Sequence, residues 1–238
     1  MKIGVISDVH NNLLALNRVL EYLEKSGCEK IICCGDIISI GPLPEETVRY
    51  IMGVENLLCV RGNHEDYLRK LGNGESLTMD MSENQASFHE WEFERLSDEC
   101  KRFIDSLPVS RLVEINGVKI YVTHYPMAGK VYMNSVRDLT LQKCEQMFSN
   151  INADIILFGH SHKFFDYENI NTRFINVPSL GCPSRSRNIA YAGILEIVDR
   201  RCVYNKVALE YDVVSVISQI DSLNYPASDE IKQIFYGL

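Results

Sequence analysis

The chain has 238 residues, of which 46% are hydrophobic and 24% are charged, and its formal net charge is −8. This composition is typical of a folded globular protein and excludes a disordered chain or a collagen-like repeat. The acidic balance argues against a long nucleic acid as partner. No apolar run approaches the roughly 20 residues that span a bilayer, so we predict no membrane segment.

The first half of the chain alternates short apolar runs with helical periodicity. Strands are predicted at 2–7, 30–34 and 56–60. Helices are predicted from Leu13 to a stop at Gly27, and from Pro44 to Met52. This alternation favours parallel strands covered by helices.

The middle of the chain has a different pattern. Residues 71–80 contain two glycines and are predicted to form a mobile loop, either a lid or a loop without a role in the site. Residues 81–107 are mostly helical in pattern, with Trp91 and Phe103 as anchors, and Pro108 ends this segment. We therefore expect a helical insertion around 71–107.

Strand signals dominate the second half. Two runs, 111–115 and 118–123, flank an Asn116-Gly117 turn and predict a hairpin. Further strands are predicted at 154–158, 164–168, 173–177, 191–198 and 203–210, and helices at 138–149, 213–223 and 228–235. With no repeat or linker, we expect a single domain over 1–238.

The eight cysteines are scattered without a CxxC pair, which favours free thiols in a reducing cytoplasm over a disulfide framework. Residues 1–8 hold one lysine and a short apolar stretch with no cleavage site. We therefore predict no signal peptide and expect a cytoplasmic protein.

Five clusters of polar residues follow predicted strand ends. They are Asp8 with His10, Gly35 with Asp36, Gly62 through Glu65, His124, and His160 with His162. Taken alone, each cluster is explained by an ordinary turn or by a histidine that is hydrogen-bonded within the core. Together they predict one site, because loops beyond the carboxyl ends of strands converge on one crevice, and Asp, Asn and His suit Mn, Fe, Ni or Zn. The sixth histidine, His89, is interpreted like Trp91 as an ordinary helix residue.

The order of these motifs, D-x-H, GD, GNHE, H and GHxH, resembles that of the calcineurin-like metallophosphoesterase superfamily from residue 3 to about residue 198. The chain is most similar to small phosphodiesterases of the YfcE type. The resemblance implies an α/β fold, a four-layer α/β/β/α sandwich of two mixed sheets flanked by helices, with the site at the sheet edge.

The resemblance also implies two divalent transition-metal ions, with manganese expected first and iron, nickel or zinc also suitable. One ion would be held by Asp8, His10, Asp36 and His162, and the second by Asp36, Asn63, His124 and His160. Asp36 would bridge the ions. His64 would contact the substrate phosphate and protonate the leaving group, so Asp36 and His64 are the expected catalytic residues.

The sequence departs from related patterns at several positions. Ile40 stands where protein phosphatases of this superfamily have a phosphate-binding arginine. Tyr125 follows His124 and is expected to narrow the pocket. Cys182, Arg185 and Arg187 follow a late strand, and each arginine is either a substrate contact or a solvated loop cation.

The resulting hypothesis is hydrolysis of a small phosphodiester or nucleotide by a metal-bridging hydroxide. Two alternatives stay open: a phosphomonoesterase or nucleotide pyrophosphatase, and a catalytically silent protein-interaction scaffold of the same fold. The expected partner is a small phosphate ester. The sequence predicts neither the natural substrate nor the oligomeric state.

Overall fold

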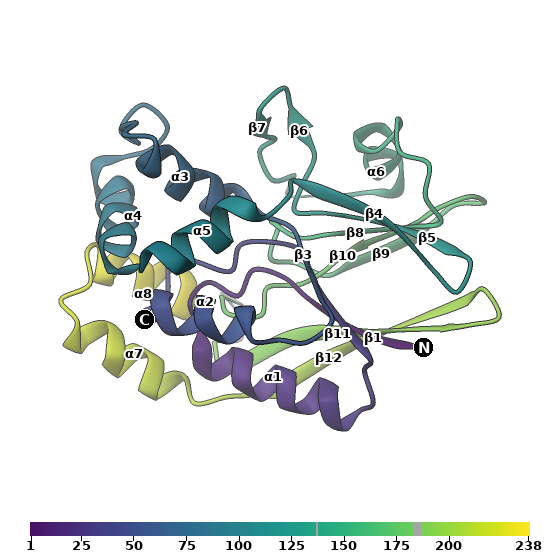
Figure 1. Ribbon diagram of the computed structural model, residues 1–238, viewed down its shortest axis with the longest axis horizontal. Coiled ribbons are helices and arrows are strands. Elements are labelled where there is room, and N and C mark those ends of the chain that lie inside the picture. Colours follow the sequence, from purple (N-terminus) through teal and green to yellow (C-terminus); the bar gives the residue numbers. More distant parts are fainter. Residues whose placement is uncertain (137, 183–186) are drawn as a thin grey trace.

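The computed structural model describes residues 1–136, 138–182 and 187–238, and Figure 1 shows its arrangement around two mixed sheets. The first five-stranded sheet has the order β12-β11-β1-β2-β3. Its strands are β1 (Lys2–Ile6), β2 (Lys30–Cys33), β3 (Leu57–Cys59), β11 (Ile189–Val198) and β12 (Arg201–Glu210). Strands β1, β2 and β3 are parallel, while β11 pairs antiparallel with both β1 and β12.

The second five-stranded sheet has the order β4-β5-β8-β10-β9. Its strands are β4 (Ser110–Ile115), β5 (Val118–Thr123), β8 (Ile155–Phe158), β9 (Phe165–Glu168) and β10 (Arg173–Asn176). Strand β8 pairs parallel with both β5 and β10. A small separate hairpin joins β6 (Met127–Ala128) to β7 (Val131–Tyr132).

The described residues also form eight helices. These are α1 (Leu13–Lys25), α2 (Pro44–Met52), α3 (Asn63–Gly72), α4 (Glu83–Arg95), α5 (Asp98–Ser106), α6 (Leu141–Met147), α7 (Val213–Ser222) and α8 (Ser228–Tyr236). Helix α6 lies on the opposite side of the two sheets from α1 and α2 (Figure 1). Within the described residues, none of the helices is long and apolar enough to cross a membrane.

Three apolar cores lie between the layers of the fold. One lies between the first sheet and most of the helices, including Leu16, Val48 and Ile220. The second joins the facing surfaces of the two sheets, and the third packs α6 on the outer face of the second sheet. The predicted sandwich of two mixed sheets flanked by helices is confirmed.

Local sequence signals explain many element ends. Asn12 caps α1 by accepting the Ala15 N–H at 3.1 Å, and Pro44 occupies the first turn of α2. Asn116 and Gly117 have φ values of 49° and 75°, as a tight two-residue hairpin turn requires. All eight cysteines are free, as predicted.

The prediction was wrong in detail between residues 63 and 107. Helix α3, which was not predicted, begins at Asn63 directly after the third strand. The long helical segment is two helices, α4 and α5, because Leu96 leaves the helical conformation and the Ser97 side chain caps the second helix. The 71–80 segment is anchored at its middle, where Leu77 is fully buried.

Candidate metal centre

The predicted cluster residues meet where strands of both sheets end. Asp8 follows β1, Asp36 follows β2 and Asn63 follows β3, while His124 follows β5 and the His160–His162 turn follows β8. Two adjoining sheet edges therefore supply ligands to one place, which is what parallel strands in each sheet make possible.

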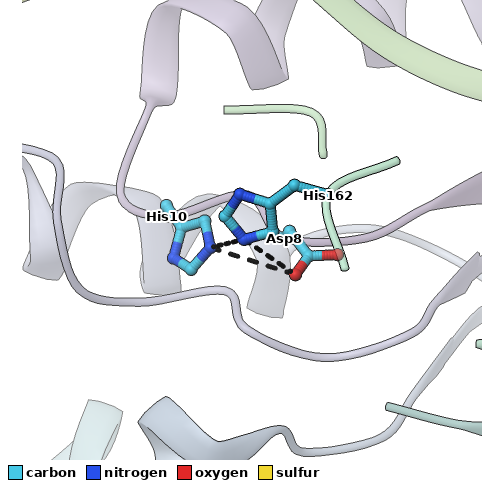
Figure 2. Close-up of side chains that lie close together, drawn as sticks. All are labelled: Asp8, His10 and His162. Carbon is cyan, nitrogen blue, oxygen red and sulfur yellow. Dashed lines mark hydrogen bonds and ion pairs between the residues drawn. The ribbon is translucent and has the colours of Figure 1, made fainter. Parts of the chain in front are cut away.

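The first group of donors combines the loops after β1 and β8. Figure 2 shows His10, His162 and Asp8 with their donor atoms turned toward one another. The His10 and His162 Nε2 atoms lie 3.1 Å apart, and His162 Nε2 lies 3.3 Å from Asp8 Oδ1. These three donor atoms lie within 4.8 Å of one another, close enough to share one cation.

The second group is centred on His124. Its Nε2 atom lies 3.1 Å from Asp36 Oδ2, 3.1 Å from Asn63 Oδ1 and 3.3 Å from His160 Nδ1. Asp36 also lies within 4.8 Å of His10, a member of the first group. The Asp36 carboxylate is thus placed between the two groups.

Backbone carbonyls fix the orientation of two of these imidazoles. His10 Nδ1 lies 3.1 Å from the Ile38 carbonyl oxygen, and His124 Nδ1 lies 2.8 Å from that of Cys34. A carbonyl can only accept, so each Nδ1 carries a hydrogen, and Nε2 is the ring nitrogen that faces the site and is left to bind a metal ion. This donor set, with its buried carboxylates, fits divalent transition-metal ions.

Strained backbone concentrates at the same place. Five of the seven predicted ligands have φ in the left-handed region: Asp8 (53°), His10 (51°), Asp36 (53°), His160 (70°) and His162 (57°). Such residues cost on the order of 1 kcal/mol each and persist only where the surroundings hold them. Here the loops hold one another, since the Asp8 and His10 N–H groups donate to the carbonyls of Gly35 and Asp36 at 3.0 and 3.1 Å.

The Glu65 side chain holds the loop that contains Asp36 in place through hydrogen bonds. Its fully buried carboxylate accepts N–H groups from Asp36 at 2.9 Å, Ile37 at 2.7 Å and Gly62 at 2.6 Å. Burial and the charge of Asp36 raise the pKa of Glu65 to about 7, although these N–H donors oppose the rise. No role was predicted for Glu65; its position, three residues after Gly62 at a helix start, is the available signal.

The segment from Asn176 to Ser179 holds the loops after β1 and β8 in place. The Asn176 amide donates to the Gly159 carbonyl at 2.5 Å and accepts from the Ser161 hydroxyl. The Ser179 hydroxyl donates to the Asp8 carbonyl at 2.9 Å. Polar side chains at the end of β10 thus fix both loops that form the first donor group.

His89 lies beside the site, contrary to its interpretation as an ordinary helix residue. It is buried on α4, and its ring centroid lies 5.1 Å from that of His64. Its Nδ1 atom lies 3.0 Å from Ser39 Oγ, whose hydroxyl donates to Glu92 Oε2 at 2.7 Å. Glu92 also accepts the Ser39 N–H at 2.7 Å and Asn11 Nδ2 at 2.6 Å. This network attaches α4 to the loops after β1 and β2, a long-range contact that no local pattern indicates.

The two carboxylates at the site remain ionised. Burial alone would raise the pKa of Asp8, but the hydrogen bond and charge of His162 hold it at about 2. Burial would also raise the pKa of Asp36, but the charge and hydrogen bond of His124 keep it well below its usual value. Burial also opposes protonation of His124, but Asp36 raises its pKa to about 10. Asp8 and Asp36 would therefore offer anionic oxygens to a metal ion, and His124 would have to give up a proton to bind one.

His64 points toward the centre from the first turn of α3. Its backbone N–H donates to Asp36 Oδ1 at 3.1 Å, and its Nε2 atom lies 3.9 Å from Asp36 Oδ2. Its Nδ1 atom is buried without a hydrogen-bond partner among the described residues. Burial lowers the pKa of His64 well below the usual value, so the imidazole is neutral in the free site.

Two cavities meet at this centre. The smaller, about 340 Å³, has walls that include His64, His89 and residues of α8. The larger, about 640 Å³, has walls that include His160 and the β6–β7 hairpin. Asn63 and Tyr67 line both, so the cavities lie on two sides of the same ligand.

The residues that depart from related patterns take different places. Ile40 is 2% exposed and lines the smaller cavity. The expectation for Tyr125 was wrong: its buried ring packs behind His160, and its oxygen accepts the Val136 N–H at 3.1 Å, so it does not narrow the pocket. Arg187 is exposed and Cys182 is buried, whereas Arg185 lies outside the described residues.

Comparisons with known proteins identify relatives of this chain. Residues 1–200 match the family model described as the calcineurin-like phosphoesterase superfamily domain. The chain is 33% identical over 170 residues to uncharacterized protein MJ0912 of Methanocaldococcus jannaschii, a match that covers 67% of this chain and 62% of that protein. It is 24% identical over 211 residues to phosphodiesterase MJ0936 of the same organism, covering 88% of this chain and 100% of that protein.

Among solved structures, hypothetical protein PH1004 from Pyrococcus horikoshii superimposes with a TM-score of 0.84 at 17% identity. This match covers 98% of the present chain and 97% of that one. At this identity the similarity establishes a shared fold.

Proposed function

Because this chain belongs to the calcineurin-like phosphoesterase superfamily, we propose that it is a binuclear metal-dependent phosphodiesterase that hydrolyses small phosphate esters. The observation that carries the proposal is the pair of donor groups joined at Asp36. A single carboxylate between two imidazole-rich groups suits two cations held close together.

The proposed ligands are those expected from the sequence. One ion takes Asp8, His10, Asp36 and His162, and the other takes Asp36, Asn63, His124 and His160. We propose manganese first, with iron, nickel and zinc also compatible with mixed nitrogen and oxygen donors. When bound, the ions supply Lewis acidity that offsets charge on the phosphoryl oxygens.

The protein residues orient the substrate and handle the proton. An anionic substrate near His64 would raise its pKa, whereas burial and the two cations would lower it. As an imidazolium His64 can give a proton to the departing oxygen; as a neutral group it can only donate a hydrogen bond. The network from Glu92 through Ser39 to His89 holds the neighbouring wall in place.

Two features favour a diester over a monoester. A diester has two organic groups, and the two cavities on either side of Asn63 offer a place for each. In addition, Ile40 lines the smaller cavity in place of a guanidinium that would bind a dianionic phosphate. Helix α8 also lines this cavity, so we infer that residues 1–238 act as one domain with the 71–107 insertion contributing walls.

The test compares kcat/KM for a diester and a monoester of the same phenol, such as bis(4-nitrophenyl) phosphate and 4-nitrophenyl phosphate, with a phosphoserine peptide as a third substrate. We expect the diester to be favoured by about tenfold or more, a difference of roughly 1.4 kcal/mol in transition-state binding. Preference for either monoester would support a phosphatase. Two tightly bound ions without turnover of any ester would support a scaffold.

A further inference from the structure

The two cavities beside the proposed metal centre differ in charge. Four basic and two acidic side chains line the larger one: Arg61, Arg69, Lys70, Lys130, Asp66 and Asp80. The smaller one has Asp80 and Glu230, and no lysine or arginine among the residues that the structure describes. An acidic protein thus presents a basic wall on one side of its centre and an acidic wall on the other.

Ion pairs leave one unpaired charge in each cavity. Arg61 and Arg69 share Asp66 at 2.7 and 3.3 Å, Arg69 also contacts Asp105 at 2.8 Å, and Lys70 contacts Asp80 at 2.7 Å. Lys130, in the exposed turn between β6 and β7, has no acidic partner within the described ranges. Glu230, which is exposed on α8, likewise has no basic partner within the described ranges. The unpaired charges are therefore a cation in the larger cavity and an anion in the smaller.

Apolar side chains line both cavities, so the difference in charge is what distinguishes the two. In the smaller cavity Phe88, Ile231 and Phe235 add aromatic and aliphatic surface to the wall that holds Glu230. An uncharged organic group gains from such a surface, whereas a carboxylate or phosphate is repelled by Glu230 and finds no cation there. In the larger cavity an anionic group meets Lys130.

The position of His64 gives the two cavities different chemical roles. His64 lines the smaller cavity only, and His160 lines the larger cavity only. A group leaving from the phosphorus must depart on the side where a proton donor can reach its oxygen. The smaller cavity is therefore the side of the leaving group.

We propose that the natural substrate is an asymmetric phosphodiester: its retained half has a further anionic group that contacts Lys130, and its leaving half is an uncharged apolar alcohol. This inference rests on the proposed phosphodiesterase function and adds which of the two ester bonds breaks. The oxygen of one water forms a bond to phosphorus and the water gives up a proton. The bond to the apolar alcohol breaks, its oxygen takes the electron pair, and the proton given up by the water ends on that oxygen, on the side of the centre where His64 lies. The anionic half leaves as a phosphate monoester.

The test is an internal competition within one substrate, phenyl 4-(carboxymethyl)phenyl phosphate, given to the metal-loaded protein. Both phenols are ordinary ones with pKa near 10, so their intrinsic leaving abilities are similar. We expect phenol to be released over 4-hydroxyphenylacetate by about threefold to tenfold, as a single exposed charge contact allows. The product ratio does not depend on the amount of folded or metal-loaded enzyme.

Charge-reversed variants connect the ratio to the two walls. Lys130→Glu should lower the ratio of phenol to 4-hydroxyphenylacetate to about 1 or below. Glu230→Lys should also lower this ratio, because the substrate carboxylate can then contact a cation in the smaller cavity. Lys25→Glu, on the exposed face of α1 with 74% of its side chain exposed, is the matched control and should keep the wild-type ratio.

Three results would overturn the inference. A ratio near 1 with brisk turnover, an inverted ratio, or a ratio that neither charge reversal changes would each remove the asymmetry and leave the phosphodiesterase proposal standing. Absence of turnover of both this substrate and bis(4-nitrophenyl) phosphate would instead overturn the phosphodiesterase proposal, and this inference with it.

Discussion

The floor and the walls of the site are built in different ways. The floor comprises the seven proposed ligands at strand ends, which come from loops of both sheets. Its backbone groups bond directly from loop to loop, as between Asp8 and Gly35 at 3.0 Å. The walls are α4, α8 and the β6–β7 hairpin, and they include exposed apolar side chains such as Val131 and Ile234.

This difference separates two properties of the site. The floor is buried, strained and supported by the carboxylate of Glu65, so we expect small changes there to affect every substrate. The walls contact the floor mainly through side chains, so we expect changes there to alter which substrate is preferred. Substitutions in the two regions should therefore give different kinetic signatures.

The largest effect is expected for Asp36→Asn in the floor. Its carboxylate lies between both donor groups, so the amide should weaken both metal sites together. We expect kcat to fall by about 10³-fold or more, because several kcal/mol of charge stabilisation are lost. Metal analysis after gel filtration checks this, and a variant that retains two ions with near-normal kcat would disprove the bridging role.

A purely steric change in the floor should come next. In Gly62→Ala the new Cβ would lie 2.1 Å from Asp36 Oδ1 and 2.8 Å from His124 Cγ, so the ligands must move. We expect a loss of about 10²-fold in kcat/KM for all esters, the cost of displacing catalytic groups by about 1 Å. Gly53→Ala is the control, because its Cβ would meet only ordinary contacts, at 3.5 Å and beyond. Equal activity of the two variants would contradict this account.

His64→Ala tests a residue between floor and walls. If His64 protonates the departing oxygen, alkyl esters should lose about 10²–10⁴-fold and nitrophenyl esters much less, because nitrophenolate needs no proton. Both metal ions should remain bound. If the two ester classes lose the same factor, His64 acts as a hydrogen-bond donor to the phosphoryl group, and loss of an ion would make it a ligand.

The smallest effect is expected in the wall. Phe235 lines the smaller cavity, and its ring centroid lies 6.2 Å from that of His162. Phe235→Ala removes this aromatic surface. The preference for a phenyl over a methyl leaving half, measured as kcat/KM with a common retained half, should fall by about threefold to tenfold. Val214→Ala, exposed on α7, is the matched control. An equal loss for both esters would place Phe235 in the floor rather than the wall.

The sequence predicted that the seven residues of the floor follow strand ends, because the signals for that placement are local. Each proposed ligand lies in a loop that follows an apolar run of strand length, as Asp8 lies after β1 and His124 after β5. Residues at the carboxyl ends of parallel strands converge at one edge of a sheet, and the packing of the two sheets brings their two edges together. The hairpin at Asn116-Gly117 and the helix opening at Pro44 were equally local, and both were confirmed.

The walls could not be predicted because they depend on contacts across long stretches of chain. His89 looked like an ordinary helix residue, and only the tertiary contact to Ser39, fifty positions away, places it beside His64. Helix α3 was missed because its first residues, Asn63 and His64, were interpreted only as a metal ligand and a substrate contact. Tyr125 has the same sequence position relative to His124 whether it faces the pocket or the core; burial against His160 decides for the core.

We propose that hydrolysis of a diester requires two ions in the floor. The most direct test adds Mn²⁺ stepwise to chelator-treated protein and follows bis(4-nitrophenyl) phosphate hydrolysis against the metal bound per chain. We expect negligible activity without metal and a plateau when two equivalents are bound. Full activity in metal-free protein, or a plateau at a single bound equivalent, would contradict it.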